Sequence, residues 1–316
     1  MDPVREIADA VLYEGHVLWP YRRSAIKNRQ RWTFGGVYPA AYAQASSDRS
    51  AVQVECLLEG QSAAVDVEVR FLHVVHRQAA SGESLEPVDE LGGYLTWDET
   101  TERTVMLSDV REAERAIVDV PPGRKVEPVD GGGIVRSWQR LEGLVEARGE
   151  QRDERLHLVR VTIRNESPWE GIERDGAIRR AFVSAHVVLR ATEGELVSAI
   201  DPPAHLEAPT EGLRNDGLWP VLVGAEGQRD TVLASPIILS DYPLIAPESP
   251  GDFFDGGEID GLLVLNILGL TDEEKRELRA GDPRAREILE RTEAMTPEEM
   301  GRLQGTIREL RPVGGR

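Results

Sequence analysis

Residues 65–76 read VDVEVRFLHVVH, and this stretch decides the fold class. Apolar side chains stand at most alternate positions from Val65 to Val75, and charged residues separate them in the first half. A period of two predicts a β-strand with one face turned toward a core. Residues 52–58 repeat the alternation and predict a further strand, with Cys56 on its buried side.

The strand pattern extends in both directions, from residue 10 to about residue 233. Residues 159–164 alternate in the same way. Residues 181–189 and 196–200 predict two more strands around a turn at residues 192–195.

Two spans within this region predict long loops. Residues 80–90 are acidic, and residues 121–133 begin with two prolines and end with three glycines. Strands of this length without intervening helices are typical of antiparallel sheets. We therefore expect a mainly β scaffold, an antiparallel sandwich or a barrel-like sheet, over residues 1–233.

The pattern changes to helices after residue 260. Three helix starts are marked by N-cap residues: Thr271-Asp-Glu-Glu274, Asp282-Pro283 and Thr296-Pro-Glu-Glu299. Gly281 predicts the end of the first of these helices. Residues 262–270 are apolar on all sides, so they form either a fourth, buried helix or a core strand. Residues 261–316 thus predict a small C-terminal α-helical tail.

Residues 235–260, SPIILSDYPLIAPESPGDFFDGGEID, separate the two patterns. Four prolines, a tyrosine and two adjacent phenylalanines give this stretch neither a helical nor a strand period. We expect an ordered connecting loop, rich in Pro and Asp, over residues 234–260. Loops of this kind often carry function.

The acidic residues at the end of this loop allow two interpretations. Carboxylates together with loop carbonyls suit calcium or magnesium, so Asp252, Asp255, Glu258 and Asp260 are candidate metal ligands. Their spacing differs from that of an EF-hand loop. Asp255 before two glycines fits a turn, and Glu258 and Asp260 fit the first turn of a helix. We favour turn and helix-cap carboxylates.

Composition excludes several classes of function. The net charge of −19 over 316 residues disfavours nucleic acid as a partner, because phosphate binding needs a cationic surface. A single cysteine excludes an internal disulfide and a cysteine-ligated iron–sulfur cluster. No apolar run approaches the ~18 residues of a membrane span, and residues 1–13 lack the apolar centre of a signal peptide. We expect a cytoplasmic protein.

Motifs of known chemistry do not occur. The sequence contains no phosphate-binding P-loop, GxGxxG, GxSxG, HExxH or CxxC pattern. His73 and His76 lie three residues apart in the predicted strand, where their side chains would point to opposite faces. We therefore expect no cofactor and favour a non-enzymatic role.

One segment opposes the acidic trend of the chain. Residues 21–32, YRRSAIKNRQRW, carry five cationic side chains and no acid. Cations among aromatic residues bind anions or acidic protein surfaces. Either this segment docks on the acidic 235–260 loop of the same chain, or it binds a partner. The candidate partner-binding residues of the two loops are Arg22, Arg23, Lys27, Arg29, Arg31, Trp32, Tyr242, Phe253 and Phe254.

Several pieces of the sequence together resemble a known family. They are LYEGHVLWPYRRSAIKNRQRWTFGGVYP (12–39), WPVLVG (219–224), ASPIILSDYPLIAPESPGDFFDGGEID (234–260), LTDEEK (270–275) and DPRA (282–285). This uncharacterised family is encoded in actinobacterial gene clusters for high-affinity uptake nickel–iron hydrogenases. The resemblance implies an accessory role in assembling, maturing or organising such a hydrogenase. It implies no catalytic residues.

Three functional hypotheses follow. The leading one is a non-catalytic accessory protein whose partner is a hydrogenase subunit or a maturation factor. The second is a metal-dependent enzyme that uses the carboxylates of residues 252–260. The third is a structural homo-oligomer whose interface is formed by residues 262–270 and the terminal helices.

Overall fold

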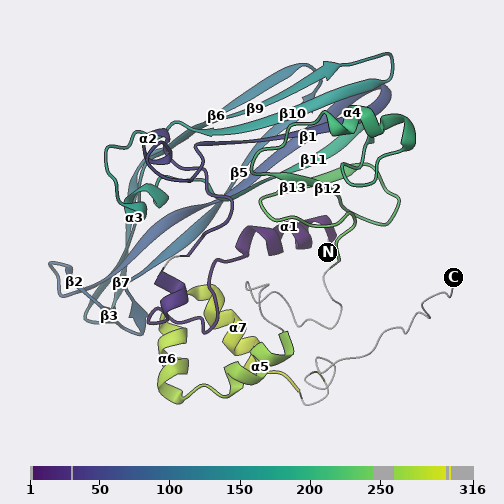
Figure 1. Cartoon of the computed structure of the whole chain (residues 1–316). Helices are drawn as coiled ribbons and strands as arrows, with labels where there is room; N and C mark the ends of the chain where they lie inside the picture. Colours follow the sequence, from purple (N-terminus) through teal and green to yellow (C-terminus); the bar gives the residue numbers. More distant parts are fainter. Residues whose placement is uncertain (1–2, 30, 245–259, 297–298, 300–316) are drawn as a thin grey trace.

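The computed structural model describes residues 3–29, 31–244, 260–296 and 299. One large antiparallel sheet forms its main body, and helices pack along one side of it (Figure 1). Its strands are β1 (Ala51–Ser81), β2 (Glu86–Val88), β5 (Trp97–Val110), β6 (Ala113–Val120), β7 (Gly123–Val129), β8 (Gly132–Trp138), β9 (Leu141–Gln151), β10 (Leu156–Asn165), β11 (Val183–Leu196), β12 (Trp219–Leu222) and β13 (Thr231–Ser235). A separate small ladder joins β3 (Glu90–Leu91) and β4 (Tyr94–Leu95).

The helices lie mostly near the two ends of the chain. They are α1 (Pro3–Tyr13), α2 (Ala40–Ala43), α3 (Arg174–Ile178), α4 (Glu207–Glu211), α5 (Asp260–Leu268), α6 (Asp272–Ala280) and α7 (Pro283–Glu293), with short 3₁₀ turns η1 (Ile26–Arg29) and η2 (Ala204–Leu206). In the part of the chain that the structure describes, no helix is both long and apolar enough to cross a membrane.

The central strand β1 contains both strands that the alternation predicts. Its first nine residues pair with β10, and its later residues lie between β11 and β5. The main core takes Val52 and Val54 from the first half but Val65 and Val67 from the second. Because the side-chain period is two, this change of parity requires an irregularity between the halves. The register with β11 shifts there, between Glu59 and Ala64.

Two glycines allow β1 and β11 to approach closely at this irregularity. A Cβ atom on Gly60 would lie 2.9 Å from the Cα atom of Gly194, and Gly194 has a φ of +87°. A larger residue at either position would collide with the neighbouring backbone. The predicted turn at residues 192–195 is therefore wrong, because these residues continue β11 through a bulge.

Three other expectations are corrected by the structure. Residues 121–133 form most of the β7–β8 hairpin, since Asp130-Gly131 supplies a tight two-residue turn and Gly131 has a φ of +79°. Residues 80–90 include the end of β1 and all of β2. Only Leu196 of the predicted strand 196–200 is in a strand, because the chain leaves the sheet after pairing with Leu58.

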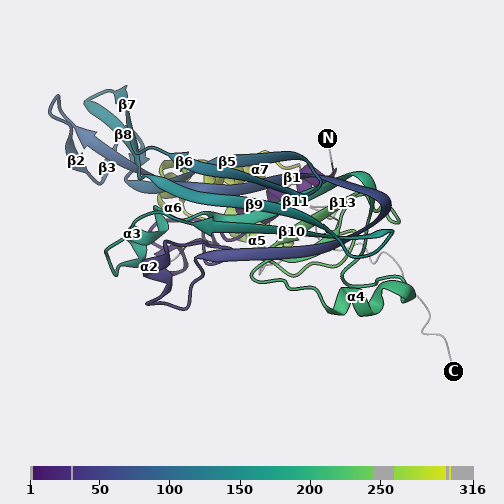
Figure 2. The same cartoon turned by 90° about the horizontal axis from the view of Figure 1, so that it is seen from above.

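The sheet folds over on itself like a sandwich. The strands β6, β9 and β10 form one layer together with the first part of β1, and the later part of β1 forms the facing layer with β5 and β11 (Figures 1 and 2). The main apolar core lies between these layers. The expected mainly antiparallel β architecture with C-terminal helices is confirmed, and the sheet stays open rather than closing into a barrel.

Helices cover the outer side of the second layer. Helix α1 buries Val4, Ile7 and Val11 against β11, β12 and β13. This helix extends into the region that the sequence pattern assigns to strands. The helices α5, α6 and α7 pack with the N-terminal loops over Leu72 and Val74 of β1.

The C-terminal helices follow their sequence signals. Residues 262–270 are mainly helical, and α5 buries Leu263, Val264 and Ile267 within the chain's own core. The side chains of Thr271 and Glu274 form the predicted capping box, and α6 ends at Gly281. Asp282 caps α7, with a proline at its first position. Thr296 and Glu299 also exchange capping hydrogen bonds.

Candidate functional site

The basic N-terminal segment docks on the C-terminal helices. Nη1 of Arg22 lies 3.0 Å from a carboxylate oxygen of Glu274 on α6. Ser24 donates to Glu277 of the same helix from its backbone N–H, at 2.9 Å, and from its hydroxyl, at 3.0 Å. These contacts join segments about 250 residues apart in the chain. The ion pair between Arg22 and Glu274 joins residues 12–39 to residues 270–275.

Asp282 is the centre of this junction. Its side chain is 1% exposed. Oδ2 lies 3.1 Å from Nε2 of His16, 3.0 Å from Nε1 of Trp97 and 3.6 Å from Nη1 of Arg31. Burial alone would raise the pKa of Asp282, but His16, Arg31 and the Trp97 indole hold that pKa well below its ordinary value. The residue is therefore a buried, fully partnered carboxylate.

The contacts of His16 determine which ring nitrogen carries hydrogen. The indole Nε1–H of Trp32 can only donate, and it lies 3.1 Å from Nδ1 of His16. Nδ1 therefore accepts, and Nε2–H donates to the ionised Asp282. His16 connects Trp32 to Asp282 through one hydrogen bond on each side of its ring.

Arg31 lies between two indole rings. Its guanidinium carbon is 4.1 Å from the ring centroid of Trp32 and 3.8 Å from that of Trp97. Nη2 donates to the backbone carbonyl of Asp98. Burial lowers the pKa of Arg31 to about 10, against the opposing charges of Asp282 and Asp98. The side chain therefore stays cationic at neutral pH.

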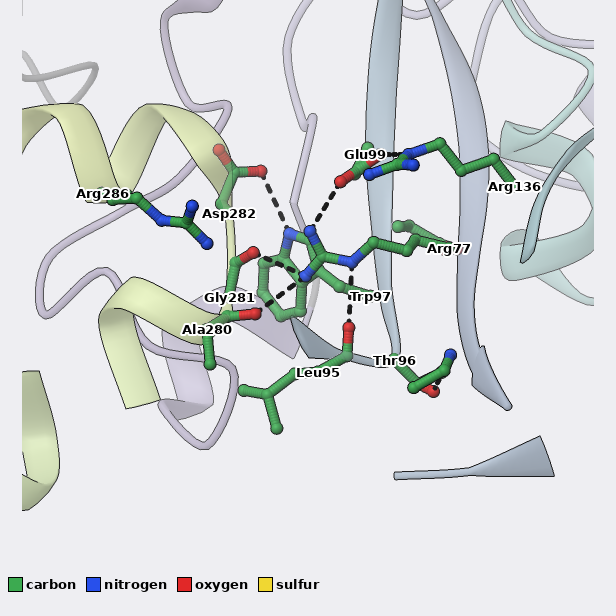
Figure 3. A network of polar contacts seen from close by, with 12 residues as sticks. Arg77, Leu95, Thr96, Trp97, Glu99, Arg136, Ala280, Gly281, Asp282 and Arg286 are labelled. Atoms are coloured by element: carbon green, nitrogen blue, oxygen red, sulfur yellow. Dashed lines mark hydrogen bonds and ion pairs between the residues drawn. The ribbon is translucent and has the colours of Figure 1, made fainter. Parts of the chain in front are cut away.

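Arg77 attaches the sheet to the end of helix α6 (Figure 3). Nη2 donates to the carbonyls of Ala280, at 2.9 Å, and Gly281, at 2.6 Å. Nη1 donates to Glu99 at 2.6 Å, and Nε donates to the carbonyl of Leu95 at 3.0 Å. Since the last carbonyls of a helix lack partners within the helix, Arg77 satisfies them from β1.

A pocket of about 850 Å³ opens beside this junction. Its volume lies within the usual range for ligand sites, ~300–1,000 Å³. Arg31, Trp32 and Trp97 form part of its wall, and Arg174 and Arg179 contribute from α3 and the residue after it. Nη2 of Arg174 donates to the carbonyls of Arg31 and Trp32, so α3 supports the N-terminal segment directly.

A histidine and a carboxylate form a pair on the pocket wall. Nδ1 of His76 lies 2.7 Å from Oδ1 of Asp98, and Nη2 of Arg179 lies 3.1 Å from both oxygens of Asp98. Burial alone would raise the pKa of Asp98, but hydrogen bonds from His76 and Arg179 hold it below its ordinary value. Because the ionised carboxylate cannot donate, Nδ1 of His76 carries the hydrogen. Nε2 has no hydrogen-bond partner among the described residues.

The candidate partner-binding residues have different surroundings. Arg22 and Arg31 have partners within the chain, and Arg23 forms an exposed pair with Asp89 at 3.4 Å. Trp32 is buried at the junction, and Lys27 is exposed on η1. The backbone of Arg29 ends η1, but its side chain lies outside the described part of the structure.

The second predicted loop is described only as far as residue 244. Tyr242 is partly buried against the main core and donates from its hydroxyl to the carbonyl of Gln228 at 2.9 Å. Phe253 and Phe254 lie outside the described residues, as do all other positions from 245 to 259. The described contacts of the basic segment reach α6, Asp282, α3 and residues 89–98.

The metal-site candidates Asp252, Asp255 and Glu258 also lie outside the described residues, and Asp260 is described only as the first residue of α5. Within the described part of the chain, no group of three or more His, Cys, Asp or Glu side chains is arranged to hold a metal ion. Cys56 is buried as expected, and burial raises the pKa of its thiol to about 12.

Of the residues that line the pocket, the sequence signals identified Arg23, Arg31 and Trp32 but missed Asp98, Arg174 and Arg179, and at the junction they missed Arg77. Arg77, Arg174 and Arg179 belong to no motif, and Asp98 follows a strand start that the pattern does not mark. Asp282 was recognised only as a helix cap. Comparison of this chain with protein-family models and with curated proteins finds no match.

Proposed function

We propose that this chain is a non-catalytic, cytoplasmic interaction protein that assists the assembly, maturation or organisation of a nickel–iron hydrogenase. The observation that supports it best is the junction at Asp282. Residues 12–39 meet residues 270–275 and 282–285 there, and the proposed resemblance rests in part on these three pieces. Residues 23–32 of the first piece also contribute to the pocket wall.

The chemistry of the junction favours a binding role over a reactive one. The carboxylate of Asp282 has three side-chain partners and a backbone donor, and His16 uses both ring nitrogens. Arg77 uses Nε, Nη1 and Nη2 to fix backbone and side-chain acceptors. Groups with all of these contacts have a structural role. Asp282 and His16 contact Arg31, Trp32 and Trp97, which form part of the pocket wall.

A gene deletion tests the proposal. In an organism that encodes this chain beside a nickel–iron hydrogenase, we expect deletion to lower hydrogenase activity and to alter subunit processing or complex size. A plasmid copy of the wild-type gene should restore all three. Unchanged activity, processing and complex size in the deletion strain would contradict the proposed function.

Complementation with point variants connects the phenotype to the junction. We expect Asp282→Asn to restore activity poorly, because it removes the buried charge that compensates Arg31. Asp272→Asn changes an exposed acid on the neighbouring helix and should restore activity fully. If both variants restored hydrogenase activity equally well, the junction would not be required for the proposed function.

A further inference from the structure

We propose that the 850 Å³ pocket binds a partner segment in which a carboxylate is flanked by basic side chains. This inference rests on the proposed function of the chain as an interaction protein. It adds the chemistry that the partner presents. The pocket carries its charges in two zones, and an occupant of this kind matches both.

The inner zone presents cationic and donor groups. The side chain of Arg31 is 5% exposed and lies against the pocket. Among the described residues, the side-chain hydrogen bonds of Arg179 all involve Nη2. Nη1 of Arg179 has no hydrogen-bond partner among the described residues, and Nε is buried without one. A guanidinium with unused donors in a pocket favours a carboxylate, which accepts hydrogen bonds in the same plane.

The one acid of this zone is already neutralised. Both oxygens of Asp98 face Arg179, and Oδ1 also accepts from His76. Nη2 of Arg179 lies 3.3 Å from Nδ1 of His76, but both nitrogens carry hydrogen, so the two groups do not satisfy each other. The inner zone therefore still has N–H donors that its contacts within the chain do not use.

The outer zone is acidic. Asp89, Glu90 and Asp175 line the pocket and are exposed, and the side chain of Asp89 is 88% exposed. The ion pair between Asp89 and Arg23 joins two exposed side chains, so it contributes little and an incoming cation can replace it. The chain as a whole is also acidic, with a net charge of −19, so it attracts cationic groups.

Only an occupant with both signs of charge fits these zones. A purely acidic segment would be repelled by the outer acids and by the net charge of the chain. A purely basic segment would leave the inner arginines facing cations, which costs several kcal/mol in a desolvated site. A carboxylate that enters the inner zone while neighbouring basic side chains contact the outer acids satisfies both. The volume suits a short segment rather than a folded domain.

Fluorescence anisotropy with defined peptides tests the inference on the wild-type protein. The probe is fluorescein-labelled G-K-K-E-K-K-G amide, and its matched control carries Gln in place of Glu. We expect saturable binding of the Glu probe and binding of the Gln probe weaker by roughly tenfold or more, the size of one lost charge-assisted hydrogen bond. No saturable binding, or equal binding of both probes, would overturn the inference.

Protein variants then assign the two zones. Arg179→Gln should abolish the preference for Glu over Gln. Arg180→Gln should keep it, because Arg180 contacts Gln139 and Trp169 and lies outside the pocket wall. Circular dichroism shows whether each variant is folded. A preference that survives in folded Arg179→Gln, or is lost equally in Arg180→Gln, would refute the assigned inner zone.

The outer zone has its own matched pair. Asp89→Asn combined with Glu90→Gln should weaken the Glu probe and reduce its dependence on salt. Glu83→Gln combined with Glu86→Gln changes exposed acids that do not line the pocket, and it should leave binding unchanged. Equal effects of the two pairs would refute the outer zone. Peptide binding and the deletion phenotype are independent readouts, so failure of this inference leaves the proposed function standing.

Discussion

The main core of the sheet and the junction at Asp282 are both buried, but they are built from opposite chemistry. The core takes valines and leucines from many strands, and each of them contributes a small share of the buried apolar surface. The junction takes a carboxylate, an imidazole and two arginines from distant segments, and each of them depends on the others. A substitution in the core should therefore lower the unfolding free energy in proportion to the apolar surface it removes. Loss of a single partner at the junction should lower it much more, because the remaining partners are left buried and unpaired.

The largest effect is expected for Asp282→Asn. Asparagine still caps α7, but it leaves the buried Arg31 without its nearest opposite charge. Removing one partner of a buried ion pair costs roughly 3–5 kcal/mol of unfolding free energy. Urea denaturation measures this cost, and Asp272→Asn serves as the exposed control. A loss below that of the control would show that the junction tolerates an unpaired charge.

The loss of unfolding free energy caused by Asp282→Asn should depend on pH in a defined direction. The pKa of Asp282 is lowered in the folded protein, so its ionised form stabilises the fold at any pH above the unfolded value of about 3.9. That contribution is lost as the pH falls below this value toward the folded pKa. We expect the difference in unfolding free energy between wild type and Asp282→Asn to be constant from pH 7 to pH 5 and to shrink below pH ~4. A difference that grows on acidification would contradict the assigned ionisation.

A smaller loss, about 2–3 kcal/mol, is expected for Arg77→Met. Methionine keeps the apolar stem but leaves the carbonyls of Ala280 and Gly281 without their donor, while Glu99 keeps Arg136 as a partner. Hydrogen exchange should accelerate in α6 and α7 and stay slow in β10. Uniform acceleration across the molecule would show that the helices and the sheet unfold as one unit.

The smallest effect is expected in the apolar core. Ile163→Val removes one methylene group from a fully buried side chain and should cost ~0.5–1.5 kcal/mol. Thermal denaturation of this variant beside Arg77→Met tests the contrast directly. A larger loss for Ile163→Val than for Arg77→Met would reverse the comparison between the two regions.

The two regions also differ in how far the sequence could predict them. Alternation at residues 52–58 and 65–76 predicts strands because side-chain period is a local property. The change from even to odd apolar positions between Val54 and Val65 was visible too, but it does not reveal that a single bent strand joins them. Helix α1 had a readable signal, since Val4, Ile7, Ala8 and Val11 recur at helical spacing.

The junction could not be predicted in this way. Asp282 and Pro283 signal a helix start, and that prediction is confirmed. Nothing near residue 282 indicates that its carboxylate meets His16, because the two are 266 positions apart. Likewise, the alternation over residues 65–76 does not show which carbonyls the next residue, Arg77, reaches from β1. The pocket wall combines residues from five separate stretches of the chain, so it can be identified only once the fold is known.

The contact between His16 and Asp282 sets an order of events during protein synthesis. His16, Arg31 and Trp32 are synthesised near the start of the chain, so they leave the ribosome long before α7. Strands from β1 to β13 can pair while the chain is still growing, since domains fold in the order of synthesis. Arg31 has to remain hydrated until Asp282 appears, because burying it alone would leave an unpaired charge. The contacts that Asp282 makes with His16, Arg31 and Trp97 can therefore form only after translation has passed residue 282.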